Sequence, residues 1–231
     1  MTRARLTFLI ILATCAAAQS AEQTMQITFD AFGIGKPPPG FSTALTGGGG
    51  PVAWVVQENP LQPGDGKVLV QTSADATNYR FPLAIVDSFS ARDVELRVRF
   101  APMAGKLDRA AGLVWRYRDA DNYYVVRANA LEGNVVLYKV EGGKRGDLKP
   151  TGAGMLAYGV KTAVPSGAWS ELGITARGRR FAVSFNGTHL FDVDDATFPN
   201  AGKVGLWTKA DSVTAFDDLR ATSRDETAAV R

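Results

Sequence analysis

The stretch that decides the fold is residues 111–127, AGLVWRYRDADNYYVVR. In its first half, one set of side chains alternates with another: Leu113, Trp115 and Tyr117 alternate with Val114, Arg116 and Arg118. A period of two is typical of a half-buried β-strand. The segment 119–121, Asp-Ala-Asp, favours a turn, and a second run follows over 122–130. The stretch therefore predicts an antiparallel hairpin.

Short runs of the same kind continue on both sides of this hairpin. Asn186-Gly187 joins the runs 181–185 and 188–193, and both residues tolerate the positive φ that a type I′ turn requires. Further strands are expected at 25–30, 67–72, 81–87, 94–100, 135–140, 169–176, 203–208 and 213–221. A helical period of 3.6 is hardly present. Many short strands at close spacing predict an all-β sandwich of two antiparallel sheets.

The chain of 231 residues is long enough for one β-rich domain, which we place at residues 22–221. Residues 142–168 are glycine-rich with little alternation, so a long excursion is expected there. The polar end of the chain, residues 222–231, is expected to form a flexible tail.

The hairpin sequence and three later segments match a known pattern. The later segments are Trp169-x-x-Leu172-x-Ile174 with Asn186-Gly187-x-x-Leu190, Gly202-x-Val204-Gly205-Leu206-Trp207, and Val213-x-x-Phe216-Asp217-Asp218-Leu219. Together they resemble the concanavalin A-like lectin/glucanase superfamily, in particular bacterial 3-keto-disaccharide hydrolase and laminin-G-like domains. The resemblance implies a concanavalin A-like jelly-roll sandwich, secreted or periplasmic, whose concave sheet often meets carbohydrate. It covers roughly residues 25–221 and concerns hydrophobic spacing and turns more than chemistry.

Residues 1–21 have the layout of a secretory signal peptide: two arginines, a short apolar run over 6–13, and a small-residue end. The run is too short for a transmembrane span, although an N-terminal anchor helix is the alternative. Removing this segment takes away two of the 26 basic residues and none of the 23 acidic ones, which leaves 24 against 23. That balance gives no electrostatic footprint for nucleic acid. We expect an exported, periplasmic or secreted protein; lipidation at Cys15, the sole cysteine, is a less favoured alternative.

Ordinary two-carboxylate glycoside hydrolysis is disfavoured by the sequence. No Glu-x-Asp-x-x-Glu strand is present, and the nearest acidic pairs are Asp93/Glu95, Asp119/Asp121 and Asp192/Asp194. We interpret the first pair as part of a solvated charged stripe and the others as turn residues. The single histidine, His189, follows the Asn-Gly turn and is expected to be exposed, so a catalytic triad lacks its parts.

A cationic and aromatic set gives better candidates for a ligand-binding face. Arg116 and Arg127 lie on the two strands of the hairpin and, if they face one groove, offer forked donors to sugar hydroxyls or a ketone. Trp207 and Lys209 share a face near the end of the chain, and an exposed tryptophan offers a platform for a pyranose ring. The alternative is that the tryptophan lies in the core and the arginines are ordinary surface groups.

Two further roles are predicted for aspartates. Asp211, just beyond Lys209, is the candidate general base if the protein is an enzyme. Asp30 and Asp217 lie in the predicted first and last strands, which tend to be neighbours in this kind of jelly roll, so they are candidate ligands of a structural calcium ion. No other cofactor is predicted.

The sequence therefore predicts an exported carbohydrate-interacting β-sandwich that binds or processes glycans outside the cytoplasm. Two alternatives remain open at this point. One is a hydrolase or lyase acting on 3-keto-glycosides, in which a cation polarises the ketone. The other is a non-catalytic envelope module that recognises protein.

Overall fold

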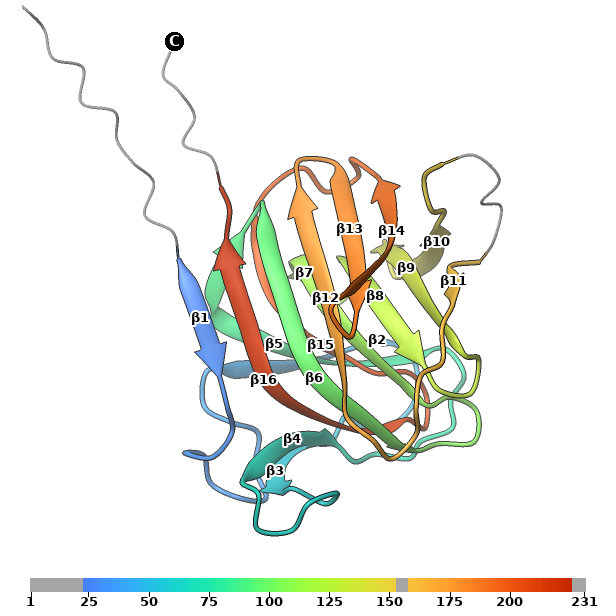
Figure 1. Ribbon diagram of the computed structural model, residues 1–231. Coiled ribbons are helices and arrows are strands. Elements are labelled where there is room, and N and C mark those ends of the chain that lie inside the picture. The colour runs from blue at the N-terminus through green and yellow to red at the C-terminus, as the bar shows by residue number, and fades with distance from the viewer. Residues whose placement is uncertain (1–22, 153–157, 226–231) are drawn as a thin grey trace, which may run out of the picture.

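The computed structural model describes residues 23–152 and 158–225, and it arranges them as two packed antiparallel sheets (Figure 1). These residues contain no helix, which confirms the predicted all-β jelly-roll sandwich. The predicted signal peptide over residues 1–21, which includes Cys15, lies outside the described residues. Across the described ranges, we find no helix with the length and apolar character needed to cross a membrane.

Sheet A contains eight strands and lies in front in Figure 1. In spatial order its strands are β14 (Thr188–Asp194), β13 (Arg180–Phe185), β12 (Ser170–Arg177), β6 (Val94–Ala104), β16 (Val213–Ser223), β4 (Lys67–Gln71) and β3 (Trp54–Glu58). The eighth, β1 (Thr24–Ile27), pairs with β16, so the first and last strands are neighbours. Asn186 and Gly187, between β13 and β14, have φ of 48° and 75°, as the predicted type I′ turn requires.

Sheet B also contains eight strands. In order they are β10 (Lys144–Leu148), β9 (Asn134–Glu141), β8 (Asn122–Asn129), β7 (Ala110–Asp119), β15 (Gly202–Trp207), β5 (Arg80–Ala91) and β2 (Phe41–Gly47), while the short β11 (Val160–Lys161) pairs with β9. The predicted hairpin over residues 111–127 is β7 and β8, at the centre of this sheet.

The main core lies between the sheets and follows from the period-two alternation. In β6, Val94, Leu96 and Val98 are fully buried, whereas Arg97 lies on the outer face and pairs with Glu95 and Glu171, each at 3.2 Å. Burial of such side chains provides the main driving force for folding in a chain whose single cysteine allows no internal disulfide.

A second apolar cluster fills the concave face of sheet B, the face turned away from sheet A. Its buried members are Phe81, Leu83, Ile85, Ala110, Val114, Tyr123, Val125, Val136, Tyr138, Val140 and Trp207. The edge strand β2 reaches the turn between β7 and β8, in the middle of the sheet, over this cluster. Thr46 in β2 hydrogen-bonds the carbonyl of Ala120 in the β7–β8 turn and lies 2.8 Å from the hydroxyl of Tyr123. Sheet B is therefore a curled half-barrel with a filled interior.

The structure differs from the expected element boundaries in three places. The excursion at 142–168 contains two strands, β10 and β11, and the sequence analysis also missed β2 and β3. Residues 222–225 are not part of a tail, because β16 continues to Ser223 and the carboxylate of Asp225 accepts N–H bonds from Arg92 and Asp93. All three differences depend on hydrogen bonds to the backbone, which leave no periodic pattern in the sequence.

Candidate functional site

Trp207 and Arg127 stand in one row on the concave face of sheet B. Trp207 in β15 pairs with Gly112 in β7, and Gly112 pairs with Arg127 in β8. A Cβ at position 112 would come within 3.2 Å of the Trp207 ring and 2.9 Å of the carbonyl oxygen of Val126. The glycine therefore leaves the space in which the indole lies against the strand.

Trp207 is not an exposed platform, so that part of the prediction is wrong. The side chain is 0% exposed and stacks on Phe81 with ring centroids 5.3 Å apart. The curling of sheet B buries it, because the interior of the half-barrel is closed by its own strands. Substituting Trp207 would remove a core side chain and destabilise the protein, so such a variant is not a test of ligand binding.

Arg127 is fully buried and neutralised by neighbouring side chains. Its Nη1 and Nη2 donate to the two oxygens of Glu132 at 2.8 and 2.9 Å, and Nη2 also donates to Asn134 Oδ1 at 2.6 Å. Burial alone would lower the pKa of Arg127, but the hydrogen bonds and charge of Glu132 outweigh it and the net shift is upward. This bidentate pair occupies the donors that a sugar would otherwise use.

Lys209 joins the same polar network, and Asp211 lies beside it in the chain. The ammonium of Lys209 donates to Asp108, whose other carboxylate oxygen accepts from Asn129. Asp211 accepts backbone N–H bonds from residues 106–108 at 2.6, 3.1 and 3.0 Å. Burial raises the pKa of Asp211, but these N–H groups hold it below its usual value, which makes the carboxylate a weak base.

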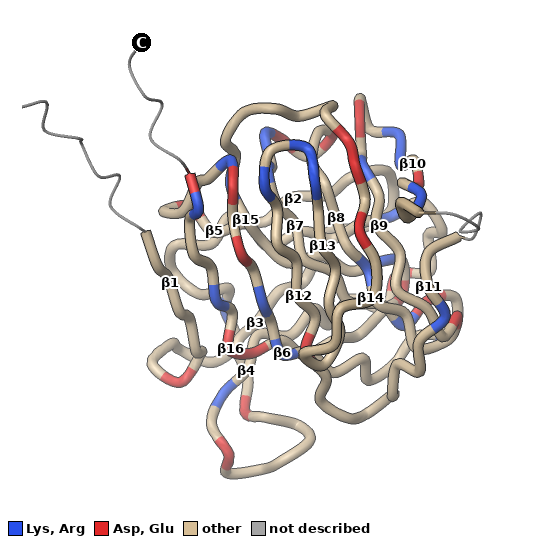
Figure 2. Tube along the Cα trace, turned by 45° about the horizontal axis from the view of Figure 1, so that its top comes forward, with Lys and Arg blue, Asp and Glu red and all other residues tan. Residues whose placement is uncertain are grey.

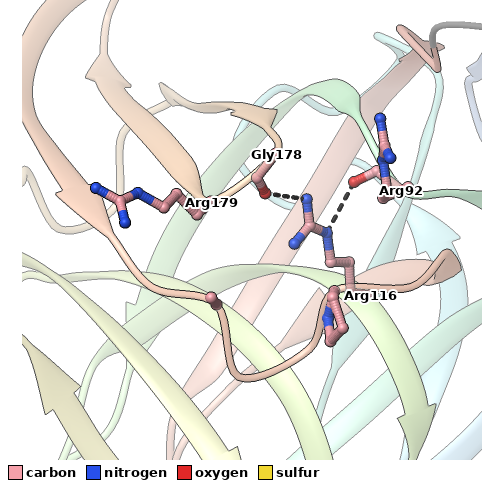
Figure 3. Close-up of a pocket in the computed structure, with 6 residues that line it drawn as sticks. Arg92, Arg116, Gly178 and Arg179 are labelled. Carbon is pink, nitrogen blue, oxygen red and sulfur yellow. Dashed lines mark hydrogen bonds between the residues drawn. The ribbon is translucent and has the colours of Figure 1, made fainter.

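Arg116 lies at the opposite end of β7 and does not share a groove with Arg127. A β-bulge follows Trp115, and Arg116 has a φ of 49°, which interrupts the alternation and turns its guanidinium to 5.4 Å from the ring of Phe181 in sheet A. The side chain is 1% exposed. It donates to the backbone carbonyls of Arg92 (2.8 Å) and Gly178 (2.6 Å), as Figure 3 shows. It also donates to the carbonyl of Phe198 at 2.8 Å.

Asp93 completes the surroundings of Arg116, and the sequence analysis misplaced it. One oxygen accepts from Arg116 Nη2 at 3.3 Å and from the Gly178 N–H at 2.8 Å, and the other accepts from Arg92 at 3.0 Å. The residue is 6% exposed, so it is not part of the solvated stripe. Beside it lies a pocket of about 180 Å³, lined by Arg92, Arg116, Gly178, Arg179, Ala196 and Pro199.

The accessible part of the concave side is an aromatic rim around Arg145 in β10. Its guanidinium lies 4.8 Å from the ring of Phe81 and 4.5 Å from that of Tyr138, within cation–π range. Tyr79 and Tyr158 flank it and are 43% and 44% exposed. The Tyr79 hydroxyl accepts the backbone N–H of Arg145 at 2.5 Å, and the Tyr158 hydroxyl hydrogen-bonds that of Tyr138.

Arg145 differs from Arg127 in its partners. No carboxylate pairs with Arg145 among the residues that the structure describes, and its buried Nη1 has no hydrogen-bond partner there. We call Tyr79, Arg145 and Tyr158 the rim. The sequence analysis missed it because Arg145 and Tyr158 lie in the 142–168 excursion. A signal was available for Tyr79, which continues the alternation of Phe81, Leu83 and Ile85.

The two proposed calcium ligands lie near each other, as predicted from neighbouring terminal strands. Burial is the largest cause that raises the pKa of Asp217, and the Asp30 carboxylate adds to it. Asp217 Oδ1 is buried without a partner among the described residues, which fits a calcium ligand. The carbonyls of Asp30 and Phe32, however, accept from the Lys67 ammonium at 2.8 Å each. In the described ranges no cluster of three or more His, Cys, Asp or Glu is placed for a metal.

Comparison with known proteins supports the fold. No family model and no curated protein matches the chain. Among solved structures, it is similar to the carbohydrate binding module CBM66 from Bacillus subtilis, with 22% identity, a TM-score of 0.59, and coverage of 83% of this chain and 99% of that one. It is also similar to domain 4 of AbnA, a GH43 extracellular arabinanase from Geobacillus stearothermophilus solved with arabinotriose: 16% identity, TM-score 0.52, coverage 86% and 90%.

A third similar structure is a putative glycosyl hydrolase from Parabacteroides distasonis, with 16% identity, a TM-score of 0.51, and coverage of 87% of this chain and 94% of that one. At these identities the likeness defines the fold, the concanavalin A-like jelly roll that the sequence analysis expected.

Proposed function

We propose that the protein binds carbohydrate at the rim formed by Tyr79, Arg145 and Tyr158. The observation that carries this proposal is the pair of half-exposed tyrosines near a half-buried arginine, Arg145, that has no carboxylate partner in the described part of the chain. Aromatic rings offer apolar area to the C–H face of a sugar, and a guanidinium donates to its hydroxyls.

The rim is held in place before any ligand arrives. Phe81 and Tyr138 fix the Arg145 guanidinium from within the half-barrel, and the Tyr79 hydroxyl also donates to the carbonyl of Gly143 at 3.0 Å. Side chains that are already ordered lose little entropy on binding, so a small contact area can still give useful affinity. The named functions of two similar structures, a carbohydrate binding module and a domain in complex with arabinotriose, support the same class of ligand.

The proposal includes export through the segment 1–21, so that the protein meets its glycan outside the cytoplasm. The mass of the mature chain tests this. Cleavage at Ala18 or Ala21 supports export as a free protein, whereas a diacylated Cys15 would make it a lipoprotein.

Catalysis on 3-keto-glycosides is the finer alternative that the sequence resemblance suggests. It requires a base near a polarising cation, and the geometry of Asp211 does not favour that residue. A binding module requires only the rim. One experiment separates the two: the mature protein is immobilised and incubated with natural disaccharides beside their 3-keto forms, and the supernatant is analysed by mass spectrometry.

We expect retention of natural sugars without turnover. Tyr79→Ala and Tyr158→Ala should each weaken binding about tenfold, equivalent to about 1.4 kcal/mol. Ile34→Ala is the matched control, because Ile34 is 55% exposed and lies outside the rim. Cleavage of the keto forms alone would replace binding with the lyase or hydrolase alternative. Neither retention nor cleavage would favour the protein-recognition module.

A further inference from the structure

The guanidinium of Arg145 lies against two aromatic pairs on the concave side of sheet B. The ring centroids of Phe81 and Tyr138 are 4.8 and 4.5 Å from it. Phe81 packs against Tyr79 of the rim, with centroids 4.7 Å apart. Tyr138 packs against Tyr158 in the same way, with centroids 6.0 Å apart. One row of contacts therefore connects the two half-exposed tyrosines through this guanidinium.

Two of the three guanidinium nitrogens of Arg145 are accessible to a ligand. Nη1 is buried, whereas Nε and Nη2 are not, and these two form no hydrogen bond with the described part of the chain. The N–H groups of Nε and Nη2 are parallel and match the spacing of the two oxygens of a carboxylate. Arg220 binds Asp218 with the same two nitrogens, at 2.9 and 2.5 Å. Arg145 therefore presents an unused site for one carboxylate.

The positive charge of Arg145 is not neutralised by an ion pair. Figure 2 shows charges of both signs around β10, but the acidic residues there have other partners. Asp147 pairs with Lys149, and Glu141 pairs with Lys139 at 3.3 Å. No carboxylate in the described ranges pairs with Arg145, so a counter-charge can come from a ligand.

The surroundings make an unpaired charge costly at this position. Arg145 is half-buried against aromatic rings, so water solvates it less well than a fully exposed arginine. Burial raises the pKa of Tyr138, and the charges of Arg127 and Arg145 act in the opposite direction, so both charges are felt inside the half-barrel. Glu132 neutralises Arg127 through two hydrogen bonds. A ligand carboxylate would do the same for Arg145.

We propose that the rim binds a uronic acid residue, whose carboxylate pairs with Nε and Nη2 of Arg145 while its ring lies against a tyrosine. This inference rests on the proposed function, because it names the class of sugar that the same site prefers. The tyrosines alone do not select a charged sugar, since an aromatic ring accepts the C–H face of any pyranose. The guanidinium does, because a carboxylate offers it two parallel hydrogen bonds and the opposite charge, and a hydroxyl offers neither.

The test compares two probes that have the same sugar rings and differ in charge: trigalacturonate and its fully methyl-esterified form. Binding of each to the mature protein is measured by calorimetry at low salt. We expect the acid to bind about tenfold more tightly than the ester, equivalent to about 1.4 kcal/mol. Added salt should weaken binding of the acid and leave that of the ester unchanged, because salt screens only the charge.

Variants of β10 assign the preference to one side chain. Arg145→Gln should bind both probes as the wild type binds the ester. Arg145→Lys should restore only part of the preference, because an ammonium keeps the charge but lacks the paired donors. Lys144→Gln is the matched control: it removes one positive charge from the neighbouring residue, which is exposed and lies on the opposite face of the strand. The melting temperature of each variant checks that it is folded.

The outcomes separate this inference from carbohydrate binding itself. Equal binding of acid and ester by the wild type would overturn the inference and leave the proposed function intact. If neither probe binds, the inference fails, and retention of natural disaccharides decides whether carbohydrate binding fails with it. Acetate that binds as tightly as trigalacturonate would overturn it, because the site would then recognise a carboxylate without a sugar. An equal loss in Lys144→Gln would overturn it too, because the preference would then follow net charge alone.

Discussion

Two buried arginines of the same sheet are satisfied in opposite ways. Arg127 has a side-chain partner with a full negative charge, Glu132, which accepts two parallel hydrogen bonds. Arg116 is held mainly by neutral backbone carbonyls, and it shares its carboxylate partner, Asp93, with Arg92. Arg116 joins three separate connections, whereas Arg127 bonds residues of its own β8–β9 hairpin.

The difference shows in their pKa values. Glu132 outweighs the effect of burial and raises the pKa of Arg127, whereas burial prevails at Arg116 and lowers its pKa. One end of sheet B therefore contains a neutralised ion pair and the other an incompletely balanced cation.

The largest effect is expected for Arg116→Met. The change leaves three carbonyls without their donor and removes one of the three donors to the buried carboxylate of Asp93. Loss of one partner of a buried charged pair costs about 3–5 kcal/mol. Urea unfolding measures the loss. Arg116→Lys should recover only part of it, because one ammonium cannot reach all three connections. Full stability of Arg116→Met would show that the loops hold themselves.

A smaller effect is expected for Arg127→Met, about 2–3 kcal/mol, because Glu132 is partly exposed and water can solvate it. The double variant Arg127→Met/Glu132→Met should lose less than the sum of the two single variants. The expected coupling energy is about 1–2 kcal/mol by denaturant titration. Additive losses would mean that the two groups act independently.

The central hairpin and one tight turn show how much of the fold can be predicted from the sequence. Alternation in 111–127 and the Asn186-Gly187 turn were sufficient to predict the sheets, because they depend on local spacing and turn chemistry. The same alternation could not show which face of sheet B is open. Tyr123-Tyr124-Val125-Val126 is an uninterrupted apolar run, a pattern typical of a strand buried on both faces. That signal indicated a filled half-barrel in place of an open groove.

The candidate site was harder to predict for a physical reason. The position of Arg116 depends on a bulge, which breaks the period-two rule, and its partners come from residues far away in the chain. The rim requires β10 to meet Tyr79 across a curled sheet, a contact set by twist and not by pairing. Long-range contacts of this kind have no local sequence pattern.

Asp211 extends the comparison to a buried anion. Backbone N–H groups donate to its carboxylate, just as backbone carbonyls accept from the guanidinium of Arg116. Because the pKa of Asp211 is lowered on folding, its contribution to stability is present above the unfolded pKa and is lost as pH falls through the folded pKa. Asp211→Asn should therefore cost about 1–2 kcal/mol at pH 7, since charge-assisted bonds are replaced by neutral ones. Melting curves of the two proteins should converge on acidification. A constant difference across pH would assign the loss to geometry and not to charge.

The smallest effect is expected at Asp217, a partly buried carboxylate whose ion-pair partner, Arg99, lies 3.9 Å away. Its raised pKa and its partnerless Oδ1 mean that a cation would relieve an existing cost, and Asp30 offers a second carboxylate. The Lys67 ammonium already takes the nearby carbonyls, so calcium must compete with it. We expect saturating calcium to raise the melting temperature by only about 2 °C, under about 1 kcal/mol at this chain length. Chelation should reverse the rise and Asp217→Asn should abolish it. An unmoved melting temperature would exclude a structural ion and leave Arg99 and Lys67 as the cations that serve the site.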